Sequence, residues 1–362
     1  MQTNMLDYDL PESAIARFPA EPRDHSRLLV FCRSSGHVCH AHFHQLPEFL
    51  TANDMLLAND SRVLPAKLTL TRSSGRKFQG LFLEELSPGN WRVMLRSDGQ
   101  LRVGEKLSLT DDQAALRWTV RLVSRYVHEP AQWLVMVSPV QDASTILRHV
   151  GEIPLPPYIE KARHKQPMSC PAGLDDRISY QTVYARAPGA LAAPTAGLHF
   201  TPDLMKRLTA HGVAQAFVTL DVGLGTFLPI RSETLRDHPM HQEKFHIPAA
   251  TVEAIRRHRE RKGRLVLVGT TAVRTLESAA SGILHGDNPA VDITGSTDLF
   301  ITPGFHFQLT DALITNFHLP KSTLLALVAA LIDITKLREL YALALREGYR
   351  FYSYGDAMLI LP

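Results

Sequence analysis

Residues 188–229 of this 362-residue chain read PGALAAPTAGLHFTPDLMKRLTAHGVAQAFVTLDVGLGTFLP. Two glycine-bearing turns, APTAGLHF and DVGLGTF, enclose a polar helical segment and an apolar run from Ala216 to Leu220. Thr201, Pro202 and Asp203 predict a helix start, because a hydroxyl cap, a proline in the first turn and an early carboxylate each favour one. Glycine turns let the backbone approach a ligand. The stretch therefore predicts a loop–helix–strand unit whose polar groups gather at its loops.

Strand and helix patterns alternate on both sides of this stretch. Strands are expected at 28–32, 53–60, 264–271, 298–301, 312–317 and near the C-terminal end, and helices at 248–263, 272–280, 321–332 and 333–348, the last capped by Asp333. Residues 151–181, which are rich in proline and basic side chains, predict a long loop. Alternation of this kind predicts an α/β fold with a mixed sheet covered by helices on both faces.

The pattern of apolar and polar residues changes between residues 64 and 139. Short alternating runs such as KLTLTR, WRVMLR and QWLVMVS are separated there by Gly, Asn, Asp and Pro. This pattern is typical of an antiparallel barrel or sandwich. Asp142 is expected to cap a helix that ends at Val150. Since 362 residues exceed what one core usually organises, we predict two domains. They are a discontinuous α/β catalytic domain over 1–63 and 151–362, and an inserted β-barrel domain over 64–150.

Composition narrows the class of protein. A formal net charge of +3 permits a polyanionic partner without requiring one. Cys32, Cys39 and Cys170 are few, odd in number and without ligand spacing, which argues against a disulfide framework and against structural zinc. The N-terminal residues lack the pattern of a signal peptide, and the longest apolar run, at 324–332, is too short to span a membrane. We therefore expect a cytoplasmic protein with no membrane contact.

Several polar features allow a structural and a functional interpretation. A histidine between apolar neighbours, such as His199, is either a hydrogen-bonded core residue or part of a site. His238, His241 and His246 lack the spacing of a helical ligand face, so we expect no metal. The basic runs at 256–264 and 161–165 are either solvated surfaces or phosphate contacts, and the second run, in a long proline-flanked loop, favours contact.

A set of ordered strings carries a resemblance that runs from the first ten residues to the last ten. They are DYDLPESAIARFP, RDHSRLLV, LLANDSRVLPAKL, LPPYI, YQTVYA, AAPTAGLHFT, VGLGTFLP, MHQEKF, LVGTTAVRTLES, TNFHLPKSTLL and YRFYSYGDAMLI. Together they resemble the S-adenosylmethionine:tRNA ribosyltransferase-isomerase family of queuosine biosynthesis. The resemblance implies transfer and isomerisation of the ribosyl moiety of S-adenosylmethionine onto 7-aminomethyl-7-deazaguanine at the tRNA wobble position. The products are epoxyqueuosine-tRNA, adenine and methionine.

This chemistry requires a base beside the sulfonium, a donor for the departing adenine and a neutral attacking amine. The loop positions of the matching strings offer suitable groups, and their spacing leaves the identity of the base open. The catalytic candidates are His199, Asp60, Glu243, Asp356 and His318. The substrate-binding candidates are Arg62, Arg177, Tyr180, Gln181, Thr195, Gly197, Gly223, Gly225, Thr226, His241, Thr270, Thr271, Arg274, Asn316 and Tyr354.

The resemblance also implies partners. S-adenosylmethionine is consumed as a substrate, so no cofactor is expected, and the other substrate is a tRNA with a GUN anticodon that carries 7-aminomethyl-7-deazaguanine, bound by a monomer. The modified base must leave its stack, so aromatic planes are expected at the entrance. Tyr158, Tyr180, Phe227 and Tyr354 are candidates, with core packing as the alternative. Asp221 stands where relatives typically have histidine. A tRNA-binding paralogue without catalysis and a methyltransferase are the competing hypotheses.

Overall fold

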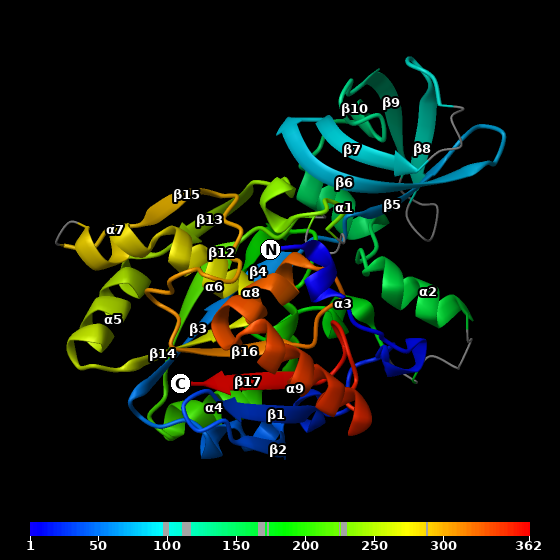
Figure 1. Cartoon of the computed structure of the whole chain (residues 1–362). Coiled ribbons are helices and arrows are strands. Elements are labelled where there is room, and N and C mark those ends of the chain that lie inside the picture. The colour runs from blue at the N-terminus through cyan, green and yellow to red at the C-terminus, as the bar shows by residue number, and fades with distance from the viewer. Residues whose placement is uncertain are drawn as a thin grey trace. The chain divides into compact units, whose positions relative to one another are not determined.

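The chain divides after Arg62 and again after Leu155 into two units (Figure 1). The computed structural model describes residues 1–362 except 97–100, 111–116, 166–170, 172–173, 224, 226–229 and 287–288. The larger unit comprises Met1–Arg62 and Pro156–Pro362, and the smaller unit comprises Val63–Leu155. Each unit has its own sheet, which is described separately below.

The larger unit is built on a nine-stranded mixed sheet, which confirms the predicted α/β class. In spatial order its strands are β15 (Ile293–Thr297), β13 (Glu243–Ile247), β12 (Ala214–Leu220), β3 (Asp54–Asn59), β14 (Arg264–Val268), β16 (Ala312–Asn316), β17 (Ala357–Leu361), β1 (Arg27–Cys32) and β2 (Val38–His42). The four central strands β12, β3, β14 and β16 run parallel to one another. Their carboxyl ends therefore share one edge of the sheet.

Both faces of this sheet are buried. Successive side chains of a strand point to opposite faces, and in β3 each set belongs to a hydrophobic core. In β3, Leu57 belongs to the core beneath α5 to α9, whereas Leu56 and Ala58 belong to a second core beneath α4. Such strands read as continuous apolar runs rather than as alternating ones. This explains why the run MLLA was recognisable as a strand from the sequence.

Helices and turns cover these faces, and several begin where the sequence predicts. The helices are α2 (Pro157–Lys165), α3 (Asp176–Ser179), α4 (Pro202–Ala210), α5 (Ala249–Glu260), α6 (Gly269–Ser278), α7 (Ala280–His285), α8 (Thr323–Ile332) and α9 (Ile334–Arg346). The short 3₁₀ turns are Thr3–Leu6, Glu12–Ala14, Arg23–His25, Phe43–Glu48, Thr195–His199 and Leu235–Asp237. Thr201 caps α4 and Asp333 caps α9, as predicted. Within the described ranges, no helix has the length and apolarity needed to cross a membrane.

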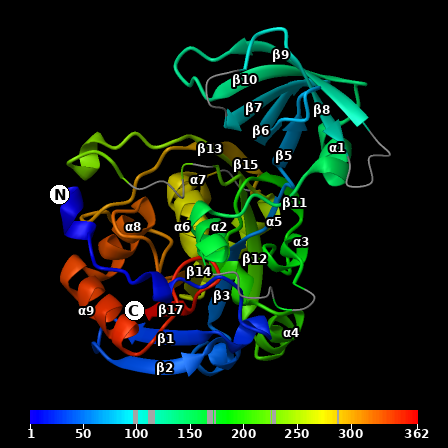
Figure 2. The ribbon, with the colours of Figure 1, turned by 90° about the vertical axis from the view of Figure 1, so that its right-hand side faces the viewer.

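The smaller unit contains a closed six-stranded antiparallel barrel, which confirms the β-barrel prediction (Figure 2). Around the barrel the strands are β10 (Gln132–Ser138), β7 (Asn90–Arg96), β6 (Lys77–Ser87), β5 (Lys67–Thr71), β8 (Lys106–Thr110) and β9 (Arg117–Arg125). Trp91, Trp118 and Trp133 are buried in it. Helix α1 (Ala143–Val150) follows, and the Asp142 side chain accepts the Thr145 amide as the expected cap. Elsewhere, β4 (Ser61–Val63) and β11 (Ala187–Ala190) form a two-stranded sheet.

Three expectations from the sequence are wrong. The strand expected over 264–271 ends at Val268, because the chain enters α6 at Gly269 and places Thr270 and Thr271 in the helix. Residues 151–181 are not one long loop, because α2 and α3 lie within them; Pro157 occupies the first position of α2, where a proline is tolerated, and Asp175 caps α3. Residues 298–301 are not a strand. The Leu299 amide donates to Thr297 Oγ1 and its carbonyl accepts from Arg274, so side chains satisfy the backbone that a strand partner would otherwise bind.

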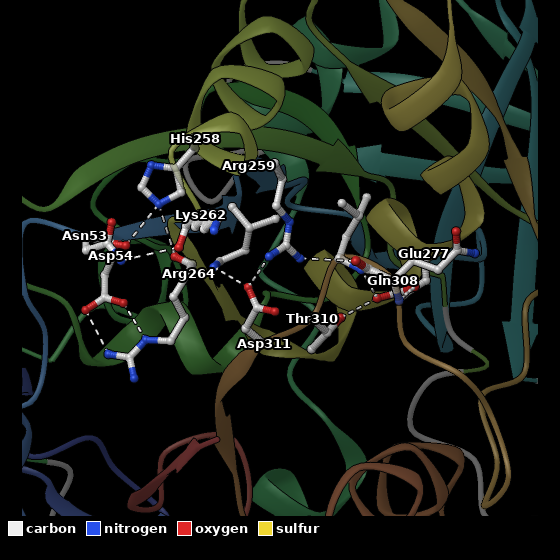
Figure 3. A network of polar contacts seen from close by, with 12 residues as sticks. Asn53, Asp54, His258, Arg259, Lys262, Arg264, Glu277, Gln308, Thr310 and Asp311 are labelled. Atoms are coloured by element: carbon white, nitrogen blue, oxygen red, sulfur yellow. Dashed lines mark hydrogen bonds and ion pairs between the residues drawn. The ribbon is translucent and has the colours of Figure 1, made fainter.

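The basic run at 256–264 is largely used inside the fold. Arg259 donates to Asp311, and Arg264 binds Asp54 through both Nε and Nη2 (Figure 3). Nearby, the Glu277 carboxylate accepts three hydrogen bonds from residues 308–310. These contacts fasten the amino ends of β3 and β14, at the opposite edge of the sheet from their carboxyl ends. Arg259 and Arg264 are therefore bound by carboxylates within the fold and do not form the solvated surface that was one of the two expectations.

Asp54→Ala should destabilise the larger unit strongly. The carboxylate is buried, and its removal leaves the Arg264 guanidinium and the Thr51 amide without their acceptor. Breaking a buried ion pair costs about 3–5 kcal/mol, and since 27% of the Arg264 side chain is exposed we expect about 2–3 kcal/mol. Urea unfolding measures the loss. Glu253→Ala removes the exposed pair with Arg257 and is the control, expected to cost less than about 0.5 kcal/mol; equal losses would contradict the prediction.

Candidate active site

A small cavity lies at the carboxyl edge of the parallel strands. Its walls include Thr195 of the AAPTAGLHF turn, Thr270 and Thr271 after β14, and Asn316 and His318 at the end of β16. The structure therefore brings together five of the predicted site residues from three separate sequence motifs. The cavity measures about 30 Å³, the size of a water molecule rather than of a nucleoside. Ligands of open α/β sheets bind outside this edge.

The amino end of α6 faces this cavity. Gly269 has φ +86°, a conformation that favours glycine, and it turns the chain from β14 directly into the helix. No side chain of the described residues caps α6, so the partial positive charge of its first turn is not screened by a capping oxygen from them. Thr271 Oγ1 is buried and has no hydrogen-bond partner among the residues that the structure describes. Hydrogen-bond donors are thus concentrated at one wall of the cavity.

Asn316 is held by a network that leaves one of its atoms unused. Its Nδ2 donates to the Tyr352 carbonyl, at 3.2 Å, and to His199 Nε2, at 3.1 Å. Because a carbonyl only accepts, this contact fixes the orientation of the amide, and the proton of the neutral His199 ring lies on Nδ1, which donates to Ser26 Oγ. Asn316 Oδ1 is buried, and no described residue gives it a hydrogen-bond partner. His199 therefore positions Asn316, whose oxygen is free to accept from a ligand.

Both buried histidines are neutral. Burial lowers the pKa of His199 to about 4, although the nearby Asp356 carboxylate works in the opposite direction. The ring also stacks on Phe43, with centroids 5.0 Å apart. Burial lowers the pKa of His318 to about 3, and its Nε2 contacts Thr315 Oγ1 at 2.7 Å. At neutral pH these rings offer hydrogen bonds without adding charge.

A buried ion pair adjoins the cavity. Val222 lines the cavity, and the next amide, that of Gly223, donates to Glu243 Oε1 at 2.8 Å. The other oxygen of Glu243 accepts from Arg274, which follows Thr270 and Thr271 by one turn of α6. Both side chains are at least nine-tenths buried, and within the described part of the chain Arg274 Nη2 has no hydrogen-bond partner. The pair therefore fixes the 222–223 backbone against α6.

Asp221 lies next to this pair. Burial raises the pKa of its carboxyl group; Lys244 opposes the shift and Glu243 adds to it. The carboxylate packs against Gly189, where a Cβ atom would lie 2.4 Å from Asp221 Oδ1. A carboxylate whose pKa is raised by burial and by a second carboxylate is a frequent feature of general bases.

A pocket of about 460 Å³ lies close to the small cavity in the same unit. Leu319 in its wall directly follows His318, and Tyr352, whose carbonyl binds Asn316, also lines it. Arg17, Lys161 and Tyr158 contribute further walls. This volume is within the range of small-molecule sites.

Other predicted residues lie in separate hydrogen-bond clusters. Asp356 accepts from Arg350 and from the Arg27 amide, and Asp60 accepts from Thr219 and pairs with Arg186. Tyr180 and Tyr354 are buried and pack edge to face, and the Tyr354 hydroxyl donates to Asp176. That carboxylate also binds Arg163 through two bonds, so this arginine of the second basic run has a partner within the fold.

The remaining predicted residues that the structure describes are glycines, exposed side chains and the half-buried Gln181. Gly197 permits close packing, since a Cβ atom there would lie 2.2 Å from the Tyr184 hydroxyl. Gly225 contacts His241 in a similar way. Arg62, Arg177 and His241 are exposed, and the Gln181 carbonyl accepts from Arg23. Thr226 and Phe227 lie outside the described residues, and so does Cys170.

Two polar residues of the network were missed at the sequence level. Ser26 binds His199 from 173 positions away, and Thr315 binds His318. Both lie inside the matching strings RDHSRLLV and TNFHLPKSTLL, which was the available signal. Among the residues that the structure describes, no group of three His, Cys, Asp or Glu side chains is arranged to hold a metal.

The sequence and the structure of this chain are similar to those of known proteins. The family model described as "Queuosine biosynthesis protein" matches residues 3–360. S-adenosylmethionine:tRNA ribosyltransferase-isomerases of Pelobacter propionicus and Gloeobacter violaceus are 43% and 44% identical over 99% of this chain and 100% and 96% of their own. The crystal structure of S-adenosylmethionine tRNA ribosyltransferase from Thermotoga maritima, 34% identical, aligns with a TM-score of 0.55 over 99% of this chain and 100% of its own. The chain therefore belongs to the S-adenosylmethionine:tRNA ribosyltransferase-isomerase family of queuosine biosynthesis.

Proposed function

We propose that the larger unit is the catalytic domain and that the small cavity at α6 is the reacting end of its site. The chain is an S-adenosylmethionine:tRNA ribosyltransferase-isomerase. It transfers and isomerises the ribosyl moiety of S-adenosylmethionine onto 7-aminomethyl-7-deazaguanine in tRNA, forms epoxyqueuosine and releases adenine and methionine. The reaction needs donors, acceptors and a base in one place.

One observation carries the assignment: two buried polar atoms without partners, Thr271 Oγ1 and Asn316 Oδ1, occur in walls of one cavity at an uncapped helix start. Unsatisfied buried polar groups are rare in folded proteins and cost stability. A ligand that supplies their partners recovers this loss. We assign Thr271 and the first amides of α6 to the developing charge of the departing adenine, as preorganised donors act at other reaction centres.

The carboxylates Asp221 and Glu243 suit the removal of a proton beside the sulfonium of S-adenosylmethionine. A sulfonium is a cation, and the hydrogens on the carbon beside it are acidic. Asp221, with its raised pKa, is our candidate for the base that removes one of them. Glu243 is held by Arg274 and Gly223 and fixes the wall. The roles of Asp60 and Asp356 stay predictions, with both carboxylates engaged in the contacts described above.

The 460 Å³ pocket is our candidate volume for S-adenosylmethionine. Its basic residues Arg17 and Lys161 suit the carboxylate of the methionyl part, and Tyr158 and Tyr352, with ring centroids 4.5 Å apart, offer aromatic surface. The other substrate is a tRNA, for which we propose a GUN anticodon. We further propose a cytoplasmic monomer.

Product analysis tests the function. The purified chain, incubated with S-adenosylmethionine and a tRNA carrying 7-aminomethyl-7-deazaguanine, should release adenine and methionine in equal amounts, measured by liquid chromatography. tRNA lacking the aminomethyl base is the control and should release neither. Binding of tRNA without adenine release would support the paralogue hypothesis instead. Formation of S-adenosylhomocysteine would identify a methyltransferase.

A further inference from the structure

One wall of the barrel carries exposed cations in adjacent strands. Lys106 of β8 lies directly opposite Arg121 of β9 in the strand register. Arg117 lies two residues from Thr119 and four from Arg121, on the same face of β9. Side chains at directly opposite positions lie about 4.5–5.5 Å apart at Cβ, where like charges destabilise a sheet. Within the described part of the chain, Lys106 and Arg121 make no ion pair or hydrogen bond through their side chains. This arrangement costs stability unless an anion binds there.

Three cations elsewhere on the same barrel are matched by carboxylates. Arg72 forms an ion pair with Glu105, and Lys67 forms one with Glu152. Arg92 forms an ion pair with Glu84 and lies 3.8 Å from Glu129. The β8–β9 wall differs from these in having no such partner among the described residues. Moreover, residues 63–155 contain 12 Lys and Arg against 9 Asp and Glu, so the whole +3 charge excess of the chain belongs to the smaller unit.

Hydroxyl groups form the next row of this wall. Ser108 of β8, Thr119 of β9 and Ser138 of β10 are paired across the three strands, one rung from Lys106, Arg121 and Met136. Arg117 donates to Ser108 Oγ, at 2.8 Å, which orients this arginine over the row. Arginine, lysine, serine and threonine are the side chains that contact phosphate oxygens in nucleic acids. No aromatic ring faces outward at these positions, so the wall lacks a platform for stacking a base.

From this pattern we infer that the outer face of β8, β9 and β10, with Lys106, Arg117 and Arg121 at its centre, binds the sugar-phosphate backbone of tRNA. The inference rests on the proposed function for the identity of the polyanion. Recognition through phosphates alone is independent of sequence. This wall therefore contributes affinity for tRNA, while the choice of the modified base belongs to the larger unit.

Charge reversal on this wall tests the inference. Lys106→Glu and Arg121→Glu, each in the full chain, should raise the tRNA Kd on the order of tenfold, measured by anisotropy of labelled tRNA. Lys77→Glu is the matched control, because β6 stands opposite β9 in the six-strand order and Lys77 is exposed. Arg121→Ala should also lower the slope of log Kd against log salt by about one, as expected for one lost phosphate contact.

The outcomes separate this inference from the proposed function. Wild-type adenine release tests the function, whereas the anisotropy measurement needs no turnover. If wild type releases adenine, the variants should show a raised KM for tRNA with kcat and the KM for S-adenosylmethionine unchanged. Equal tRNA Kd values for Lys106→Glu, Arg121→Glu and Lys77→Glu would overturn the inference, whether or not adenine is released. Circular dichroism of each variant checks that the barrel is intact.

Discussion

Thr271→Val should lower kcat on the order of 10²-fold while leaving the fold as stable as wild type or more so. The Thr271 hydroxyl is buried without a partner, so its replacement by an isosteric methyl removes an unsatisfied polar group. If that hydroxyl donates to the departing adenine, the loss falls on the transition state, and kcat and kcat/KM decrease together. Steady-state adenine release measures the first effect and thermal unfolding measures the second.

Thr275→Val, one turn further along α6, is the matched control. Its hydroxyl donates to the Thr271 carbonyl within the helix, and the side chain is fully buried. This variant should lose about 1 kcal/mol of stability and keep its kcat. The two variants therefore predict opposite signatures from one chemical change. A Thr271→Val enzyme with wild-type kcat would remove the adenine-donor role from this cavity.

The sequence predicted most of the larger sheet because the decisive signals are local. The apolar run before Asn59, the caps Thr201 and Asp333 and the alternating runs of the barrel each act within a few residues of their own position. Local signals failed where the side chains of distant residues decide the structure. Arg274 and Thr297 satisfy the backbone of Leu299, and this prevents the strand that the apolar residues suggest.

The candidate site divides in the same way. Thr270, Thr271, Asn316 and His318 were candidates because they lie in strings that resemble the family. The structure brings them together because both strings follow parallel strands, whose carboxyl ends lie at one edge of the sheet. The sequence did not predict which of the candidate residues takes which role in the reaction. Whether His199 acts as a base or positions Asn316 depends on the Tyr352 carbonyl, and the raised pKa of Asp221 depends first on burial. Contacts of this kind are set by tertiary packing alone.

Acid should unfold the larger unit between pH 6.5 and 4 because of His199 and His318. Their pKa values fall from an ordinary 6.5 to about 4 and about 3 in the folded state. Below pH 6.5 the unfolded chain binds protons that the folded chain does not, so stability is complete above that pH and decreases as the pH falls. Each histidine approaches a slope of about 1.4 kcal/mol per pH unit once the pH lies well below 6.5, which makes a combined loss of about 3 kcal/mol between pH 6.5 and 5.

Urea unfolding at pH 7.5, 6 and 5, followed by a probe in the larger unit, measures this loss. Substitution of one buried histidine should remove about half of the pH slope, since one of the two coupled protons is gone. His318→Asn is suited to this, because its lower stability at pH 7.5, from the lost Thr315 contact, is separable from the slope. His37→Gln, a substitution at an exposed histidine, is the control. If His318→Asn and His37→Gln keep the same slope as wild type, carboxylates rather than buried imidazoles govern the acid transition.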